Sequence, residues 1–502
     1  MEQYLEETYG RGCYQILLLL LVSNFSLISG YFFQTMIFDG FVPTFTCNLT
    51  DPSLIWFKTV DAPEPSEIQC FYAESNITTL RHKCPQFIYN RSIMIDSYVI
   101  EYDLVCDREY ILTWLDSIYI VFQCFTWLIA IISDKIGRRP VIFVMIFFQT
   151  LISIIVLFES NLVIIFISRA VLGSCNMLTY IGFFYFMEML PESEKYLSNI
   201  YWLTWAVGYT MTTGVAYLSQ STFYIHLCFL FLTIFYIPLI VLMKESPNWL
   251  FTRSRMVEAL NVIKYIGQMN KRPVLRNDPE IIKELTTKKI ESDLEQVEES
   301  ILGYFKIPKL LLTSFIMAGT YSVLISSYIV TSNSVDFISD NIFLNTLIQG
   351  LLELPTSLTS AWIVAKFKRR PPVFTTMLSV SILVLLNGIF FDYTYIRLVS
   401  GLLCKFLLIN GICIYAYLVS EITPISLHGS GFFAVITMAH LTSGVSSFIY
   451  RANIRPIVLN SVFSMLFLAF GILTYVFIPE TDSIDLILTI SDAKKLKGPF
   501  NI

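Results

Sequence analysis

The sequence predicts an all-α membrane protein with twelve transmembrane helices in two sets of six. Of its 502 residues, 55% are apolar and only 15% are charged, whereas soluble domains carry roughly 25% charged residues. A soluble protein of this composition would expose too much apolar surface to stay dispersed. The apolar residues also gather into runs of about 20, the length that crosses a bilayer. The polar stretch 244–308 divides these runs into equal halves.

Twelve apolar runs can be placed in order along the chain. The first six lie near 14–36, 111–133, 140–158, 161–187, 197–219 and 222–243, and the second six near 309–331, 341–364, 372–391, 396–420, 429–450 and 456–478. They define an N-terminal six-helix bundle over 14–243 and a C-terminal one over 309–478. The first run is too long, and its flank too acidic, for a cleaved signal peptide.

Basic residues predict the orientation. They concentrate in the turns after the second and eighth runs and in the central stretch 244–308. We expect this central stretch to form short helices. Because basic loops stay on the cytoplasmic side, we expect residues 1–13, the central stretch and the tail 479–502 to be cytoplasmic. We expect a multi-pass protein of the plasma membrane.

The stretch 37–110 is predicted to be a large extracellular loop. It carries three glycosylation sequons, at Asn48, Asn76 and Asn90, which we expect to be at least partly glycosylated. It also carries four cysteines: Cys47, Cys70, Cys84 and Cys106. Loops on the secretory side are oxidised, so we expect two disulfides, for which four cysteines allow three pairings.

The motifs of soluble enzymes are missing from the sequence. It contains no phosphate-binding loop, no Gly-x-Ser-x-Gly nucleophile elbow and no pair of histidines at zinc-ligand spacing. The net charge of −5 gives no reason to expect nucleic acid. We therefore expect a protein that is not an enzyme, with no catalytic residues, metal or cofactor, whose partners are the lipid bilayer and a small-molecule substrate.

Seven short segments, distributed over nearly the whole chain, have the form of recognisable sequence motifs. They are Phe41-Val-Pro43 to Cys47, Glu101-Tyr-Asp-Leu-Val-Cys-Asp107, Ser133 to Pro140, Glu245-Ser-Pro-Asn-Trp-Leu250, Asn341 to Pro355, Glu421-Ile-Thr-Pro424 and Pro479-Glu480-Thr481. Together they resemble the organic cation, anion and carnitine transporters (solute carrier family 22) of the major facilitator superfamily. The resemblance implies the major facilitator fold, with a small organic ion held between the two bundles and moved by alternating access. It favours a cation or zwitterion over an anion.

The charged turn after the second run is a candidate gate. Asp134, Arg138 and Arg139 surround Gly137 there. Charge-assisted bonds from such a turn to neighbouring helix ends would hold one side closed and break on opening. Four further charges are candidate members of the gate: Arg169 within the fourth run, and Glu188, Glu245 and Glu421 at the ends of the fourth, sixth and tenth runs. The alternative interpretation is that all these charges are solvated and only set the orientation.

Three departures from the family pattern concern this gate. In the second-half copy of the turn, Ala365 stands where an acid is expected and Lys368 where Gly is expected. Asn248 occupies a position where the family usually has Arg. The departures at Ala365 and Lys368 predict a weaker lock in the second half.

Three ionisable residues near mid-membrane are candidate substrate-binding residues: Glu353, Lys405 and His440. Charges within a bilayer are costly and usually face a cavity or a partner. The alternatives are a buried Glu353–Lys405 ion pair and a neutral, hydrogen-bonded core histidine. Four aromatic residues complete a candidate cage for an organic cation, or else only pack against lipid and helix: Trp202, Trp205, Tyr209 and Tyr328.

Two other functions compete with an organic ion carrier. One is a sugar porter of the same superfamily, and the other is a non-transporting membrane glycoprotein with the same fold. No sequence pattern identifies a co-transported or counter-transported ion.

Overall fold

The computed structural model describes residues 12–48, 54–56, 70–74, 82–158, 161–176, 178–272, 286–287, 305–333, 341–423, 428–451 and 454–481. Every predicted apolar run coincides with a helix or a pair of helices within these residues. In lipid each backbone N–H and C=O group must be satisfied within the protein, so a long apolar run in a bilayer forms a helix. The first and last residues of the helices differ from the predicted ones by a few positions.

The N-terminal half contains the first six spans. They are α2 (Cys13–Asp39), α5 (Tyr110–Phe122) with α6 (Thr126–Ile136), α7 (Arg138–Phe158), α8 (Leu162–Cys175) with α9 (Leu178–Glu188), the 3-10 helix η3 (Glu192–Trp202) with α10 (Leu203–Ser219), and α11 (Thr222–Ile240). Within the second span the helix changes to 3-10 geometry at η2 (Gln123–Phe125) between α5 and α6. The fourth span is described as α8 and α9, with Asn176 in a turn after α8.

The C-terminal half contains the other six spans. They are α16 (Pro308–Asn333), α17 (Ile342–Lys366), α18 (Arg370–Ile389), α19 (Thr394–Ile422), α20 (His428–Arg451) and α21 (Pro456–Phe477). Within the described residues, nine helical segments of the chain are long and apolar enough to cross a membrane. The predicted spans outside this set are α10, α17 and α20. These three helices make the main contacts between the halves, and each of them buries polar side chains, such as Thr212, Gln349 and Ser443.

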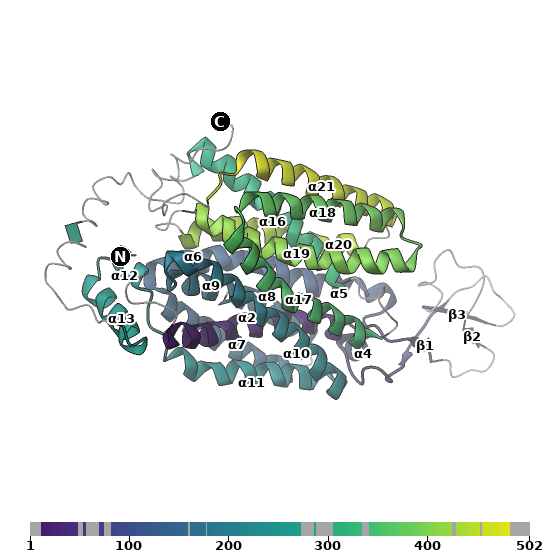
Figure 1. Ribbon diagram of the computed structural model, residues 1–502. Helices are drawn as coiled ribbons and strands as arrows, with labels where there is room; N and C mark the ends of the chain where they lie inside the picture. The colour runs from purple at the N-terminus through teal and green to yellow at the C-terminus, as the bar shows by residue number, and fades with distance from the viewer. Residues whose placement is uncertain are drawn as a thin grey trace.

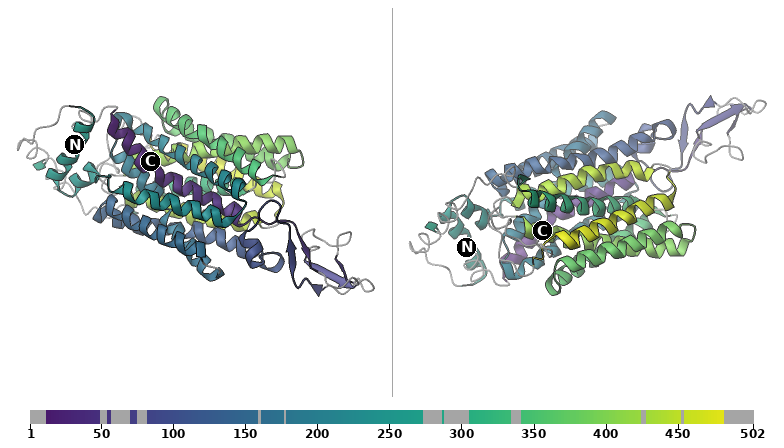
Figure 2. Two further views of the ribbon diagram at one scale, coloured as in Figure 1. Left: turned by 90° about the horizontal axis from the view of Figure 1, so that it is seen from below. Right: turned by 90° about the horizontal axis from the view of Figure 1, so that it is seen from above.

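The two halves repeat one packing pattern. α2 packs on α10 as α16 packs on α20, and α7 packs on α11 as α18 packs on α21. Between the halves, α10 packs on α17 and α20 packs on α5 and α6. Figures 1 and 2 show the purple-to-teal half beside the green-to-yellow half, with their helices running along one common direction. This arrangement of two six-helix bundles is the major facilitator fold.

A disulfide-bonded loop projects from one end of the helices, which we call the outer end (Figure 1). Strand β1 (Phe45–Cys47) pairs antiparallel with β5 (Phe87–Tyr89), and β2 (Leu54–Trp56), β3 (Phe71–Glu74) and β4 (His82–Lys83) form a second antiparallel sheet. Of the three open pairings, the structure has Cys47–Cys84 and Cys70–Cys106. Asn90 is exposed and Asn48 is half-buried, whereas Asn76 lies outside the described residues.

The opposite end, which we call the inner end, carries the short helices predicted between the halves. They are α12 (Pro247–Thr252) and α13 (Met256–Met269). The apolar face of α13 is buried, and the Asn270 side chain that follows it accepts a hydrogen bond from the Tyr14 backbone N–H (3.0 Å). This contact ties α13 to the start of α2. Residues 1–11 of the predicted N-terminal segment 1–13, most of the stretch 273–304, and residues 482–502 of the predicted tail 479–502 lie outside the described residues.

Candidate functional site

A cavity of about 90 Å³ lies between the two halves near the middle of the helices. Each half contributes nine lining residues, which include Phe33, Trp202 and Trp205 from the first and Tyr328 and Glu353 from the second. Because about 10–15 Å³ on this scale holds one water, the cavity has room for several waters or for part of a small organic molecule.

Aromatic contacts join the halves on either side of this cavity. Toward the outer end, the ring of Phe343 on α17 lies 5.9 Å from Phe38 and 5.6 Å from Tyr217. Toward the inner end, the ring of Phe184 on α9 lies 4.4 Å from Phe432 and 5.6 Å from Phe433. The halves therefore touch both above and below the cavity.

Glu353 is the acidic side chain of the cavity wall, and it is paired. Its Oε1 lies 3.2 Å from Lys405 Nζ and accepts a hydrogen bond from the Tyr328 hydroxyl (3.1 Å). Lys405 also donates to Gln349 Oε1 (2.6 Å) and lies 4.8 Å from the Tyr209 ring. The ion pair that the sequence left as an alternative is thus present. Lys405 and Tyr209 lie behind Glu353 and are not among the residues that line the cavity.

Aromatic side chains from both halves meet beside Glu353. Trp205 Nε1 donates to the Tyr328 hydroxyl (3.3 Å), and the Phe33 ring lies 5.7 Å from both the Trp205 and the Tyr328 ring. Since Trp205 and Phe33 belong to the first half and Tyr328 to the second, this cluster joins the halves at the cavity. Gln349, whose side-chain oxygen accepts a hydrogen bond from Lys405, was not predicted as a site residue. Its position four residues before Glu353, on the same face of α17, could have indicated it.

Several polar atoms of cavity-lining side chains have no hydrogen-bond partner among the described residues. They are Glu353 Oε2, Trp202 Nε1 and both ring nitrogens of His440. The His440 ring lies edge-on to Tyr180, with centroids 6.0 Å apart. The hydrogen-bonded core histidine considered from the sequence is therefore not what the structure contains. A buried polar group without a partner is costly, so a ligand in this cavity would gain by bonding these atoms.

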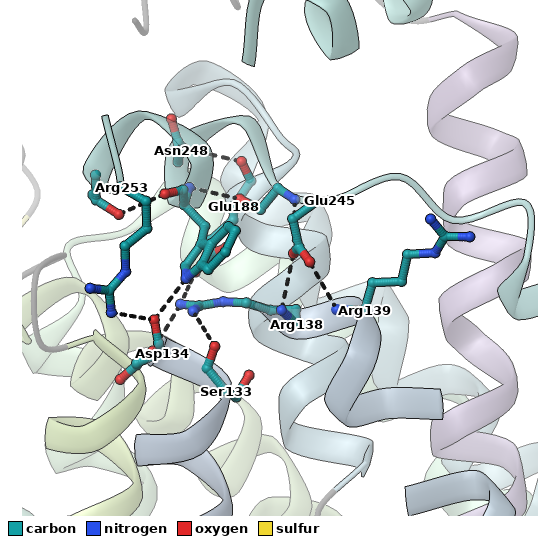
Figure 3. Close-up of polar contacts among 11 residues, drawn as sticks. Ser133, Asp134, Arg138, Arg139, Glu188, Glu245, Asn248 and Arg253 are labelled. Atoms are coloured by element: carbon teal, nitrogen blue, oxygen red, sulfur yellow. Dashed lines mark hydrogen bonds and ion pairs between the residues drawn. The ribbon is translucent and has the colours of Figure 1, made fainter. Parts of the chain in front are cut away.

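The candidate gate forms a cluster at the inner end (Figure 3). The Arg138 guanidinium lies 2.8 Å from Glu188 and 3.0 Å from Asp134, and it donates to the Ser133 carbonyl (3.2 Å). The Arg139 guanidinium does not join it and donates instead to the Val241 carbonyl (3.2 Å). Of the two arginines, Arg138 thus makes the side-chain ion pairs.

Glu245 binds the beginning of α7 through backbone groups. Its carboxylate accepts the backbone N–H groups of Arg138 (3.0 Å) and Arg139 (3.2 Å). A carboxylate at this place is favoured by the positive end of the helix dipole. Burial raises the pKa of Glu245 above its usual value of 4.5, and these N–H donors oppose that rise.

Helix α12 covers the same cluster from the inner end (Figure 3). Trp249 Nε1 (2.8 Å) and the Arg253 guanidinium (2.6 Å) both donate to the Asp134 carbonyl at the end of α6. Asn248 Nδ2 donates to the Glu188 carbonyl (3.1 Å). The roles of Trp249 and Arg253 were not predicted, because they depend on where α12 lies.

The second half has a related cluster in the turn before α18. Glu480 accepts the backbone N–H groups of Arg369 (2.7 Å) and Arg370 (3.3 Å), as Glu245 does in the first half. The Arg369 guanidinium lies 3.5 Å from Glu421. Glu480 was absent from the predicted gate, although its place after the last span of its half matches that of Glu245.

Arg169 is separated from this gate. It lies at the outer end, where it forms a buried ion pair with Asp39, and Asp39 also lies 3.1 Å from His226 Nε2. The guanidinium is also 5.7 Å from the ring of Tyr98, a residue of the short helix α4 (Tyr98–Tyr102) in the outer loop. The structure thus places Arg169 with the outer loop and away from Asp134 and Arg138.

Comparisons with known proteins agree with this fold. The sequence model of the family described as "Sugar (and other) transporter" matches residues 78–489. Solute carrier family 22 member 4 of Mus musculus is 23% identical over 420 residues, which are 82% of this chain and 74% of that protein. Organic cation/carnitine transporter 2 of Homo sapiens is 22% identical over 426 residues, 82% of this chain and 75% of that protein.

One solved structure illustrates the similarity of fold. The proton:xylose symporter XylE, bound to 6-bromo-6-deoxy-D-glucose, has a TM-score of 0.67 at 15% identity. The match covers 96% of this chain and 98% of that chain. At this identity the similarity concerns the fold alone.

Proposed function

The chain belongs to the sugar (and other) transporter family, as a solute carrier family 22 type member of the major facilitator superfamily, and we propose that it carries a small organic cation or zwitterion by alternating access. Its relatives are transporters and not enzymes. The proposal places the protein in the plasma membrane, with the inner end and both termini in the cytoplasm. The orientation follows from the basic residues of the inner turns.

The observation that carries the proposal is the unpartnered oxygen of Glu353 in a cavity shared by both halves. Glu353 Oε1 forms an ion pair with Lys405 and accepts a hydrogen bond from Tyr328, whereas Oε2 has no protein donor in the described part of the chain. An ionised carboxylate can only accept hydrogen bonds, so Glu353 Oε2 needs a partner that donates one. An ammonium or another N–H group of a cargo supplies that donor.

Lys405 limits how much net negative charge the cavity offers. Because its ammonium offsets the Glu353 carboxylate, the cargo meets a local acceptor and not an uncompensated charge. The rings of Phe33, Trp205 and Tyr328 add faces that attract a cation. Also in the cavity lining, the Trp202 indole N–H and a ring N–H of His440 can donate to an acceptor group of the cargo. This combination suits a zwitterion as well as a simple amine, and one relative is named for organic cations and carnitine.

Transport follows if the contacts at the two ends of the cavity break in turn. Opening the inner end separates Phe184 from Phe432, and opening the outer end separates Phe38 from Phe343. The charged clusters around Arg138 and Arg369 lie at the inner end, where they stabilise its closed form. Rocking of two similar halves about a central site is the general mechanism of such carriers.

Uptake by cells that make the protein tests this function. A panel of labelled amines, carnitine-like zwitterions, carboxylates and sugars is compared with cells that lack the protein. Accumulation of amines or zwitterions supports the proposal. Accumulation of sugars alone would show a sugar porter, and no accumulation of any member, with the protein at the surface, would favour a non-transporting glycoprotein.

Glu353→Gln tests the site itself. Loss of a bond to a charged group costs about 1.5–3 kcal/mol, which corresponds to a roughly ten- to hundredfold loss of affinity. Because this variant leaves Lys405 buried without its partner, Glu353→Gln with Lys405→Gln serves as a second variant in which no charge remains. Glu258→Gln, on the exposed side of α13, is the matched control. Cargo affinity equal to wild type in both site variants would exclude Glu353 from the site.

A further inference from the structure

The turns that precede α7 and α18 are equivalent in the two halves but differ in charge. The first turn and its partners hold three basic and three acidic side chains: Lys135, Arg138, Arg139, Asp134, Glu188 and Glu245. The second turn and its partners hold four basic and two acidic side chains: Lys366, Lys368, Arg369, Arg370, Glu421 and Glu480. The charges sum to zero in the first turn and to +2 in the second.

Two substitutions between the halves account for this surplus. Ala365 stands where the first turn has Asp134, and Lys368 stands where it has Gly137. The backbone N–H groups of Arg369 and Arg370 are bound by Glu480, and the Arg370 guanidinium lies 4.7 Å from the Tyr475 ring. Lys366 and Lys368 are both exposed. The surplus charge therefore lies on the two lysines at the protein surface.

Lys366 lies on the face of α17 that is turned to lipid. Large apolar side chains on this face are about half exposed along the whole helix: Leu344, Leu351, Leu358 and Trp362. Their spacing of seven, seven and four residues puts them on one side of a helix. Lys366 comes four residues after Trp362, so it continues the same stripe one turn closer to the inner surface.

The aromatic side chains beside Lys366 are typical of a membrane–water boundary. Lys366 Nζ lies 5.0 Å from the centroid of the Trp362 ring, and the Trp362 and Phe367 rings are 5.7 Å apart, edge to face. Trp is enriched where acyl chains meet headgroups. A lysine one turn beyond such a tryptophan reaches the level of the lipid phosphates.

We propose that Lys366 and Lys368 bind the headgroup of an anionic phospholipid of the inner leaflet, with Trp362 packed against its glycerol and upper acyl chains. Basic side chains at this depth are attracted to anionic lipids such as phosphatidylserine. Phosphatidylcholine, whose phosphate is neutralised by its own choline, gains little from the same lysines. The bound lipid adjoins the second-half gate turn, which lacks the acid present in the first half.

Binding of defined lipids to the purified full-length chain tests this proposal. The detergent-solubilised protein is mixed with phosphatidylserine or phosphatidylcholine of identical acyl chains, and bound lipid is counted by native mass spectrometry. We expect wild type to prefer phosphatidylserine, and Lys366→Gln with Lys368→Gln to lower that preference roughly fivefold for each lysine removed. Lys135→Gln, the equivalent of Lys366 in the balanced first turn, serves as the matched control and should leave the preference unchanged.

A second variant adds a charge and removes none. Ala365→Asp, at an exposed position, gives the second turn the acid of the first and should also lower the preference for phosphatidylserine. The proposal is overturned if the double lysine variant keeps the wild-type preference, or if Lys135→Gln lowers it equally. The proposal is likewise overturned if inorganic phosphate displaces bound phosphatidylserine as effectively as added phosphatidylserine does. The lysines would then bind a free anion and not a lipid headgroup.

Discussion

His440 is a buried residue of the cavity lining whose ring nitrogens have no hydrogen-bond partner in the described part of the chain. Its ring touches Tyr180 by its edge. Glu353, by contrast, is held by Lys405 and Tyr328. A new charge at position 440 therefore acts on the cargo more directly than a change at Glu353, which also disturbs Lys405.

His440→Asp should strengthen the uptake of cations. The added carboxylate offers a charged contact worth about 1.5–3 kcal/mol, so the apparent affinity for an amine should rise roughly tenfold or more. His440→Arg should weaken cation uptake and admit carboxylates, and His440→Gln, which stays neutral, is the control. Concentration-dependent uptake measures all three. Equal affinities in all variants, at equal surface amounts, would show that His440 does not face the cargo.

Asn248→Arg should tighten the inner gate. Glu188 Oε1 binds Arg138, but Glu188 Oε2 is buried with no partner in the described structure, and Asn248 reaches only the Glu188 carbonyl. An arginine at 248 can supply the missing donor and stabilise the closed inner end. Uptake should slow several-fold while equilibrium binding of cargo stays within a few-fold. Asn248→Lys, whose single charged group cannot form the same paired bonds, should slow uptake less, and faster uptake by Asn248→Arg would contradict the assignment.

At the scale of elements, the contacts of the candidate gate are made at the ends of helices. In both halves a glutamate after the last span binds the first backbone N–H groups of the third or ninth span, Glu245 at α7 and Glu480 at α18. In the first half only, an acid at the end of the preceding helix adds an ion pair, Asp134 with Arg138. The first-half turn is therefore the more strongly held of the two.

Asp134→Asn should slow transport without removing binding. The neutral amide weakens the contact to Arg138 in a largely buried pair, in which the Arg138 side chain is 8% and the Asp134 side chain 20% exposed. The closed and open forms of the inner end then change their relative stability by about 1.5–3 kcal/mol, the usual worth of a hydrogen bond to a charged group. Uptake rate should fall while the equilibrium affinity for cargo stays within a few-fold. Lys135→Gln is a control in the same turn. A collapse of affinity with normal turnover of bound carrier would assign Asp134 to binding instead.

Cytoplasmic acid should favour the closed inner end through Glu245. Burial raises the pKa of this carboxyl, so the form in which Glu245 is buried holds its proton more tightly than a form in which water reaches it. Lowering the pH therefore stabilises the buried, closed form. Efflux from vesicles should slow as the pH on the inner face falls from about 7 to about 5, and Glu245→Gln should flatten this response. An unchanged response in that variant would place the titrating group elsewhere.

At the scale of the whole molecule, the two ends of the helices are chemically distinct. The outer end carries the loop with Cys47–Cys84 and Cys70–Cys106, and this loop is attached to the helices by Asp96, which accepts bonds from the Thr222 backbone (2.5 Å) and the Ser221 hydroxyl (2.7 Å). The inner end carries α12, α13 and the two charged turns. This asymmetry is what the proposed orientation requires.

Glycan removal and thiol labelling test that orientation. Endoglycosidase should shift the wild-type band on a gel, and Asn48→Gln or Asn90→Gln should each reduce the shift. Thiol reagents should not label the four loop cysteines before reduction. If the protein shows no glycan shift and its loop thiols are free, the proposed topology is wrong. Asn24→Gln is the control: Asn24-Phe-Ser26 is also a sequon, but it lies within the first span, so this variant should leave the shift unchanged.

The sequence by itself determined the number, order and approximate length of the helices, because a bilayer requires continuous apolar runs and such runs are local. It also pointed to Glu353 and His440, since a polar group within an apolar run is visible without a fold. It missed Gln349, Glu480, Trp249 and Arg253, whose roles come from residues distant in the chain.

Only the tertiary structure decided which of the charged groups pair and which polar atoms remain available. It selected one disulfide pairing of three, assigned Lys405 to Glu353, and left Glu353 Oε2 and the nitrogens of His440 in the cavity. It also separated Arg169 from the gate and placed it beside Asp39. These outcomes depend on distances between segments far apart in the chain, and such distances are set by how the helices pack, which no local pattern of residues records.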